Sequence, residues 1–152
     1  MEPEAAIVNL YSPGDTLSMH RDVAEQCDKG LVSVSIGCDA IFVIGLDGVP
    51  PLQEGMDRAS KMDDEKDGGC DDEELGAKVI ALKLRSGDAV YMTGASRFAW
   101  HGVPKIIPGT CPEWLRNWPA EEMDESGFNR FEGWRGWMEE KRINLNVRQM
   151  FD

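Results

Sequence analysis

The stretch LVSVSIGCDAIFVIG, residues 31–45, is rich in Val, Ile, Leu and Phe and is interrupted by Gly and Asp. A second stretch of this kind, KVIALKLRSGDAVYMTG, occupies residues 78–94. Short runs of β-branched and aromatic residues bounded by turn residues are typical of strands. The sequence therefore predicts a mainly β protein, a sandwich or barrel in which consecutive strands pair antiparallel.

The length and composition favour one domain over residues 1–152. A chain of 152 residues can bury one core, and its 41% hydrophobic and 29% charged residues are ordinary for a globular protein. No apolar run reaches the roughly 18 residues that cross a bilayer, and no secretory signal is visible. The four cysteines form no CxxC pair. We expect an intracellular protein with free thiols and no membrane segment.

The acidic charge is concentrated in one segment. The net charge is −12, and residues 54–78 contain ten Asp or Glu and four Lys or Arg, which is half of it. Like charge with few aromatic or β-branched residues is typical of a solvated segment, so we predict a disordered acidic loop at 50–78. The charge outside this loop is still negative, which counts against a protein that grips a polyanion.

Residues 108–141 depart from the β pattern, with Pro, Gly and four of the five tryptophans. We predict an inserted loop with a short Trp-rich helix. Five residues at near-helical spacing predict a face packed on the sheet. These residues are Phe128, Phe131, Trp134, Trp137 and Met138.

The two histidines suggest a metal site. In TLSMHRD, residues 16–22, His20 and Asp22 share one side of a strand, because residues i and i+2 do so. His101, in SRFAWHGVPK, follows the strand predicted to end near DAVYMTG. Two histidines and one carboxylate can hold Fe(II) on one face and leave positions open for a co-substrate and oxygen. For either histidine taken alone, a role without metal binding is favoured. His20 would then be a polar residue at a strand edge, and His101 would be a loop residue packed under Pro104.

The ending RINLNVRQMF adds a second polar feature. Arg142, Asn144, Asn146 and Arg148 alternate with Ile143, Leu145 and Val147, so the polar residues share one face. Arg and Asn side chains are suited to holding carboxylates. In VNLY, residues 8–11, Asn9 and Tyr11 offer further donors on one face. The combination predicts an iron site beside a pocket for a 2-oxo acid. The alternative is an exposed polar face on an edge strand.

The motifs NLY, PGDTLSMHRD, VSVSIGCDAIFVIG, LRSGDAVYMTGASRFAWHGVP and RINLNVRQMF occur in an order that resembles the AlkB family of Fe(II)/2-oxoglutarate dioxygenases. Within that family the chain is similar to the eukaryotic subgroup of the first AlkB homologue. The resemblance implies a partial double-stranded β-helix, or jelly roll, carrying the acidic loop and the Trp-rich helical insertion. It implies the cofactors Fe(II), 2-oxoglutarate and O2, with His20, Asp22 and His101 as iron ligands. The implied 2-oxoglutarate contacts are Asn9, Tyr11, Arg142, Asn144 and Arg148.

The resemblance also assigns roles to three arginines. It places Arg142 on the distal carboxylate of 2-oxoglutarate and Arg148 near the iron-bound end. Arg97, in GASR, matches a family position beside the site, where it would support an iron ligand or the substrate. In the family the substrate-recognition lid lies largely before NLY, so we expect a truncated chain that carries the catalytic core without its lid.

The implied function is oxidative demethylation of alkylated bases in DNA or RNA. The methyl group is hydroxylated and leaves as formaldehyde, and 2-oxoglutarate becomes succinate and carbon dioxide. The base would be extruded or single-stranded. Two alternatives stay open. One is a protein hydroxylase or demethylase of the same chemistry, which the net charge of −12 suits better. The other is an inactive lidless fragment or binding module.

Overall fold

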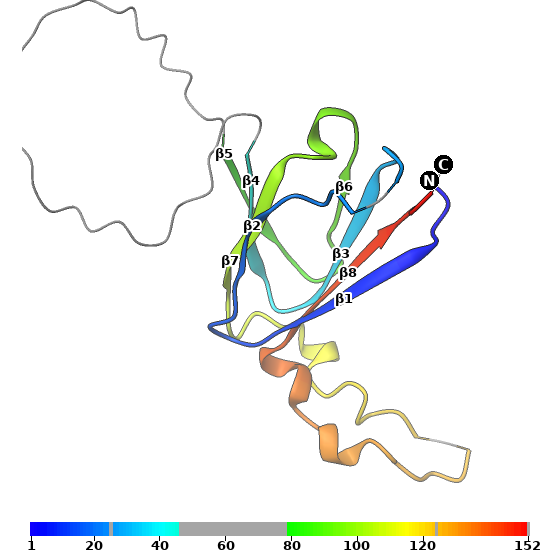
Figure 1. Cartoon of the computed structure of the whole chain (residues 1–152). Helices are drawn as coiled ribbons and strands as arrows, with labels where there is room; N and C mark the ends of the chain where they lie inside the picture. Colours follow the sequence, from blue (N-terminus) through cyan, green and yellow to red (C-terminus); the bar gives the residue numbers. More distant parts are fainter. Residues whose placement is uncertain (25, 46–78, 124, 152) are drawn as a thin grey trace, which may run out of the picture.

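The computed structural model describes residues 1–24, 26–45, 79–123 and 125–151. Their strands form two four-stranded antiparallel sheets that face each other (Figure 1). The described residues supply eight strands, the number in a jelly roll, so the mainly β prediction is confirmed. Sheet A has the order β1 (Ala5–Tyr11), β8 (Arg142–Arg148), β3 (Leu31–Gly37) and β6 (Ala89–Met92), and sheet B has the order β2 (Leu17–His20), β7 (Trp100–Ile106), β4 (Ala40–Gly45) and β5 (Val79–Leu84).

The prediction that consecutive strands pair is wrong for every strand pair except β4 and β5. The stretch 31–45 divides at Gly37, and its two halves enter different sheets. Gly37 has a φ of +92°, and a Cβ there would clash with the carbonyl oxygen of Lys141. Beyond this turn the Cys38 N–H donates to the same carbonyl at 2.8 Å. The chain therefore leaves sheet A along a path that only glycine permits.

In sheet A, strand β8 carries polar side chains inside and apolar side chains outside. The alternate residues of β8 that begin with Arg142 line the space between the sheets. The intervening residues face outward, and the register continues this pattern, with Val8 opposite Leu145 and Leu145 opposite Val34. On the edge strand β1, Val8 and Leu10 are 57% and 61% exposed. The apolar face, which a sheet usually buries, thus points outward here.

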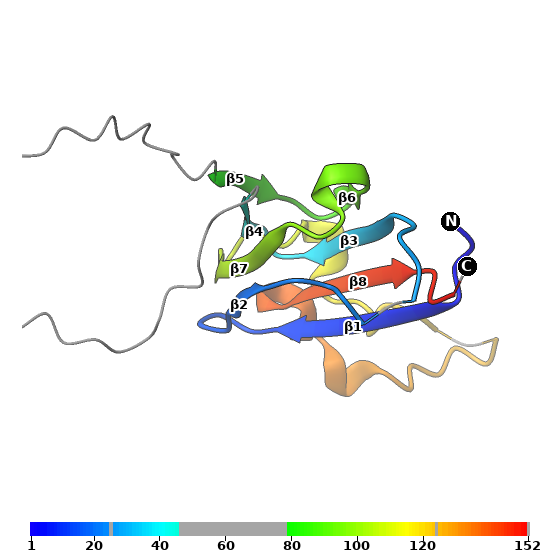
Figure 2. The same ribbon diagram turned by 45° about the horizontal axis from the view of Figure 1, so that its top comes forward.

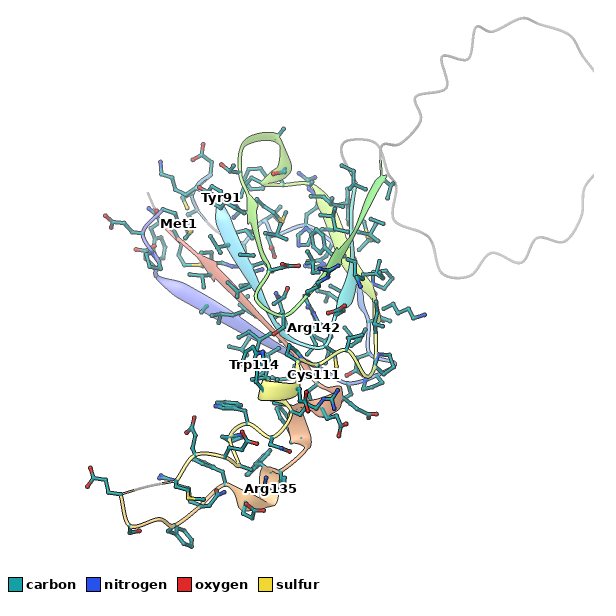
Figure 3. All side chains as sticks on the ribbon, turned by 180° about the vertical axis from the view of Figure 1, so that it is seen from behind. Met1, Tyr91, Cys111, Trp114, Arg135 and Arg142 are labelled. Atoms are coloured by element: carbon teal, nitrogen blue, oxygen red, sulfur yellow. The ribbon has the colours of Figure 1, made fainter. Side chains whose placement is uncertain are left out.

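The apolar core includes residues of both sheets and of the insertion. The insertion lies at one end of the barrel (Figure 1). The insertion is not one helix but contains short 3-10 helices, η2 (Glu113–Leu115), η3 (Glu132–Trp134) and η4 (Trp137–Glu140). Leu115 and Met138 belong to the core, and Trp137 packs against it. Phe128 and Trp134 are 65% and 51% exposed, so the predicted packed face is wrong for them. Figure 3 shows the insertion leading away from the barrel beyond Cys111 and Trp114.

The two ends of the described chain lie side by side, as Figures 1 and 2 show. The Glu4 N–H donates to the Arg148 carbonyl, which closes this edge. The predicted acidic loop at 50–78 lies outside the described residues. Across the ranges that the structure covers, no helix has the length and apolarity needed to cross a bilayer.

Gly102 sets how closely β2 approaches β7 beside His101. A Cβ at Gly102 would lie 2.8 Å from the Leu17 carbonyl oxygen and 3.2 Å from the Met19 nitrogen. We expect Gly102→Ala to lower the free energy of unfolding by about 1–3 kcal/mol, because the two backbones must separate. Urea denaturation measures this, with Gly133→Ala as the control, since Gly133 has open space around it. Equal stability of the two variants would refute the close-approach argument.

Candidate metal and co-substrate site

Three predicted ligands meet where β2 ends beside β7. His20, the last residue of β2, lies directly opposite His101 in the antiparallel ladder, and their ring centroids are 4.4 Å apart. Asp22 follows β2 and turns back between them. Its carboxylate oxygens lie 3.9 Å from His20 Nε2 and 3.6 Å from His101 Nε2. The three donor atoms lie within 4.8 Å of one another, as one metal ion requires.

Backbone carbonyls orient both imidazoles. His20 Nδ1 donates to the Ser18 carbonyl at 2.9 Å, and His101 Nδ1 donates to the Ala99 carbonyl at 3.0 Å. With the proton held on Nδ1, each Nε2 keeps its lone pair and points toward Asp22. The two histidines are therefore arranged as metal ligands before any metal binds.

The Asp22 carboxyl is ionised well below neutral pH. Its interaction with His101 is the largest cause that lowers the pKa of Asp22 to about 2, and burial opposes it. The charge of Arg148 adds to the lowering, and so does the charge of each histidine when its ring is protonated. The distance of 3.6 Å between Asp22 Oδ2 and His101 Nε2 is too long for a hydrogen bond, so this interaction is electrostatic. The third donor is thus an anion at physiological pH, as a metal ligand must be.

A cavity of about 260 Å³ extends from the three ligands between the sheets. It is below the roughly 300–1,000 Å³ of pockets for drug-sized ligands, so it suits a small molecule. Sheet A contributes mostly polar and charged groups, and sheet B contributes mostly apolar ones. The lining residues are Ile7, Asn9, Leu17, His20, Asp22, Leu31, Ser33, Phe42, Leu84, Met92, His101, Val103, Arg142, Asn144, Asn146 and Arg148.

Arg142 is a buried cation without a carboxylate partner among the described residues. Its side chain is 1% exposed and lies between the sheets (Figure 3). Nη2 donates to Ser35 Oγ at 2.9 Å, while Nε and Nη1 have no hydrogen-bond partner in the described part of the chain. Burial lowers the pKa of Arg142, although a guanidinium keeps its charge at neutral pH. Two directed donors and a charge without a contacting carboxylate suit a carboxylate ligand.

Tyr11 lies opposite Arg142 in the β1–β8 ladder. Its hydroxyl is buried and unpartnered within the described residues. Burial raises the pKa of Tyr11, and the charge of Arg142 partly offsets this. The hydroxyl is therefore protonated at neutral pH and can donate to the same anion, although Tyr11 is not among the cavity-lining residues.

The structure places the other predicted residues differently. Asn9 lines the cavity. Asn144 also lines it, but its amide donates to Ser33 Oγ at 2.7 Å and to the Val34 carbonyl at 3.1 Å, so this nitrogen supports β3. Arg148 Nη2 lies 3.5 Å from Asp22 Oδ1, so Arg148 contacts the predicted metal-binding carboxylate itself. Arg97 is outside the cavity and holds the Asp22 backbone instead, with Nη1 donating to its carbonyl at 3.0 Å.

The sequence interpretation missed three polar residues near the cavity. Asn146 and Ser33 line it, and Ser35 holds Arg142. The sequence pattern could have identified the two serines, because Leu31, Ser33 and Ser35 lie on one face of β3 by the period of two. Asn146 was already placed on the polar face of β8 but was not proposed as a contact.

The comparisons with known proteins agree with this geometry. The model of the 2OG-Fe(II) oxygenase superfamily matches residues 1–148. The chain belongs to this superfamily. It is 52% identical to an N6-methyladenosine RNA demethylase ALKBH of Cryphonectria parasitica, over 98% of this chain and 58% of that protein. It is 40% identical to the tRNA demethylase abh1 of Schizosaccharomyces pombe, over 97% of this chain and 36% of that protein.

Among solved structures, the chain is similar to OsALKBH1, with a TM-score of 0.60 and 25% identity over 98% of this chain and 51% of that one. The resemblance to the AlkB family is thus confirmed. The chain spans about three fifths of the length of the Cryphonectria parasitica protein and about a third of the length of the Schizosaccharomyces pombe protein.

The superfamily uses Fe(II), 2-oxoglutarate and O2, and the residues present fit this set. Two imidazoles and a carboxylate are a donor set that suits Fe(II). The unpartnered donors of Arg142 and Tyr11 fit a carboxylate within the same interior.

Arg142 costs stability when no anion is bound. Each buried unsatisfied donor costs about 1–3 kcal/mol, so we expect Arg142→Met to leave the free energy of unfolding of the ligand-free protein unchanged or higher. Denaturant unfolding measures this, with the exposed Arg135→Met as the control. A fall of about 2 kcal/mol or more in Arg142→Met alone would show that the guanidinium is already satisfied.

Proposed function

We propose that this chain is an Fe(II)/2-oxoglutarate-dependent dioxygenase that removes methyl groups from bases in RNA or DNA. The observation that carries the proposal is the buried Arg142, whose unpartnered donors share one cavity with His20, Asp22 and His101. A ligand-binding cation and a three-donor metal site in one interior match a dicarboxylic co-substrate that also chelates iron. An inactive relic would have no reason to keep a destabilising buried cation.

Each residue has a part in this proposal. His20, Asp22 and His101 would hold Fe(II), and Arg142 with Tyr11 would hold the distal carboxylate of 2-oxoglutarate. When bound, the metal and co-substrate supply the oxidation: the methyl C–H becomes C–OH, O2 is consumed, and 2-oxoglutarate becomes succinate and CO2. The hydroxymethyl group then leaves the base nitrogen as formaldehyde. Arg148 would fix the Asp22 carboxylate, and Phe42, whose ring centroid is 5.8 Å from that of His101, would exclude water.

Methylated adenine in RNA is the substrate that we favour. The two curated relatives described above are named as an N6-methyladenosine RNA demethylase and a tRNA demethylase. Half of the net negative charge of this chain lies in residues 54–78, outside the described structure. Beside Asp22, the exposed Arg21 and Lys29 offer cations for a phosphate backbone. The intracellular location expected from the sequence is part of this proposal, and the buried free thiols of Cys27, Cys38 and Cys111 agree with it.

The first test needs no substrate. Anaerobic addition of Fe(II) and then 2-oxoglutarate to the wild-type chain should give the visible charge-transfer band of a chelated iron–keto-acid complex. We expect no band in His101→Ala, because one ligand is lost, and none in Arg142→Met at the same 2-oxoglutarate concentration. Arg135→Met should match wild type, since Arg135 lies in the insertion away from the barrel (Figure 3). No band in folded wild-type protein would favour the inactive-fragment alternative.

The substrate test compares single-stranded RNA and DNA oligonucleotides that carry N6-methyladenine with a methylated peptide of equal length. We expect formaldehyde and succinate in equal amounts with the oligonucleotides, and binding that weakens as salt rises. Turnover on the peptide alone, with salt-insensitive binding, would instead establish the protein-demethylase alternative.

A further inference from the structure

Asp22 lies outside the strands and is held through its backbone carbonyl. It lies two residues beyond the end of β2, in a connection to β3 that has no ladder hydrogen bonds at this point. The Asp22 carbonyl instead accepts a hydrogen bond from Arg97 Nη1 at 3.0 Å. Arg97 Nε donates to the Lys29 carbonyl at 2.7 Å. One guanidinium therefore ties together both ends of the 22–29 connection.

Arg97 is as buried as the core. Its side chain is 1% exposed, and it is among the largest fully buried side chains of the described chain. A planar guanidinium presents donors in fixed directions, so the two carbonyls that it binds are held at a fixed separation. This arrangement restricts Asp22 more tightly than a flexible lysine could.

The residues that follow Arg97 contact the same site. The Phe98 carbonyl accepts a hydrogen bond from Arg21 Nε at 2.7 Å. The Ala99 carbonyl accepts the Nδ1 hydrogen of His101 at 3.0 Å. Residues 97–99 therefore hold the residue before Asp22, the Asp22 backbone and the His101 ring. This segment connects the carboxylate side of the metal site to the β7 side.

We propose that Arg97 is a positioning residue that presets the separation between Asp22 and His101 and so determines how tightly the site binds a divalent metal. The inference rests on the proposed function, because it takes the three residues to be metal ligands. Arg97 itself is not among the cavity-lining residues, and its hydrogen bond to Asp22 is made at the backbone carbonyl. Its effect passes through the Asp22 carbonyl, and the Ala99 carbonyl of the same segment fixes the opposing ring.

The test measures metal affinity directly. We expect Arg97→Lys to bind Mn(II) about 10- to 100-fold more weakly than wild type by calorimetry, as loss of a group supporting a metal ligand does. An ammonium keeps the charge but cannot hold both carbonyls in the fixed geometry. The visible absorption spectrum of bound Co(II) should also change, because it reports the coordination by the Asp22 carboxylate. Arg135→Lys is the matched control and should bind as wild type does.

A purely structural role predicts a different result. Arg97→Lys would then unfold at a lower temperature, yet at temperatures where it is folded it would bind Mn(II) with wild-type affinity and give the wild-type Co(II) spectrum. That outcome would overturn the positioning role and leave the proposed function intact. Wild-type protein that binds neither metal would overturn the proposed function and this inference together. Arg97→Met, which removes the hydrogen bonds to the Asp22 and Lys29 carbonyls, should weaken binding further. If this variant does not fold, Arg97→Lys decides.

Discussion

The constraint on which the structure depends is that the inner side of β8, in the middle of sheet A, is polar. A buried guanidinium loses its hydration, and only a directed anion or acceptor can replace it. Arg142 receives one acceptor, Ser35, from the neighbouring strand and leaves two donor nitrogens for a ligand. The serines of β3 and the asparagines of β8 continue this interior. A small anion in the cavity would accept hydrogen bonds from these two nitrogens of Arg142.

In the metal site, two strands place the histidines opposite each other, and backbone carbonyls orient their rings. The β2–β7 ladder sets His20 opposite His101, and Gly102 allows the two strands to approach closely. The Ser18 and Ala99 carbonyls then select the ring nitrogen that faces Asp22. Asp22 has no strand to hold it, which is why two buried arginines contact it, Arg148 at the carboxylate and Arg97 at the backbone.

The sequence predicted local features well and long-range pairing poorly. The alternation of RINLNVR identified the polar face of β8, because a period of two is a local property. Strand partners are not local, so the division at Gly37 that sends β3 and β4 into different sheets was missed. The strand β7 was also missed, since Gly102 and Pro104 obscure its pattern and Pro104 lacks a ladder donor. The near-helical spacing after Phe128 misled because that segment forms short 3-10 helices with two exposed aromatics.

The Trp-rich insertion supports the site from the closed end of the barrel. Its buried Met138 and Leu115 join the core with Cys38, and the Lys141 carbonyl holds the turn after β3. Lys141 immediately precedes Arg142, so the end of the insertion also determines where the guanidinium enters the interior. An apolar layer here keeps water from Arg142, and charges interact more strongly in such surroundings than in water. The same layer that makes an unpaired guanidinium costly therefore strengthens its hold on a carboxylate.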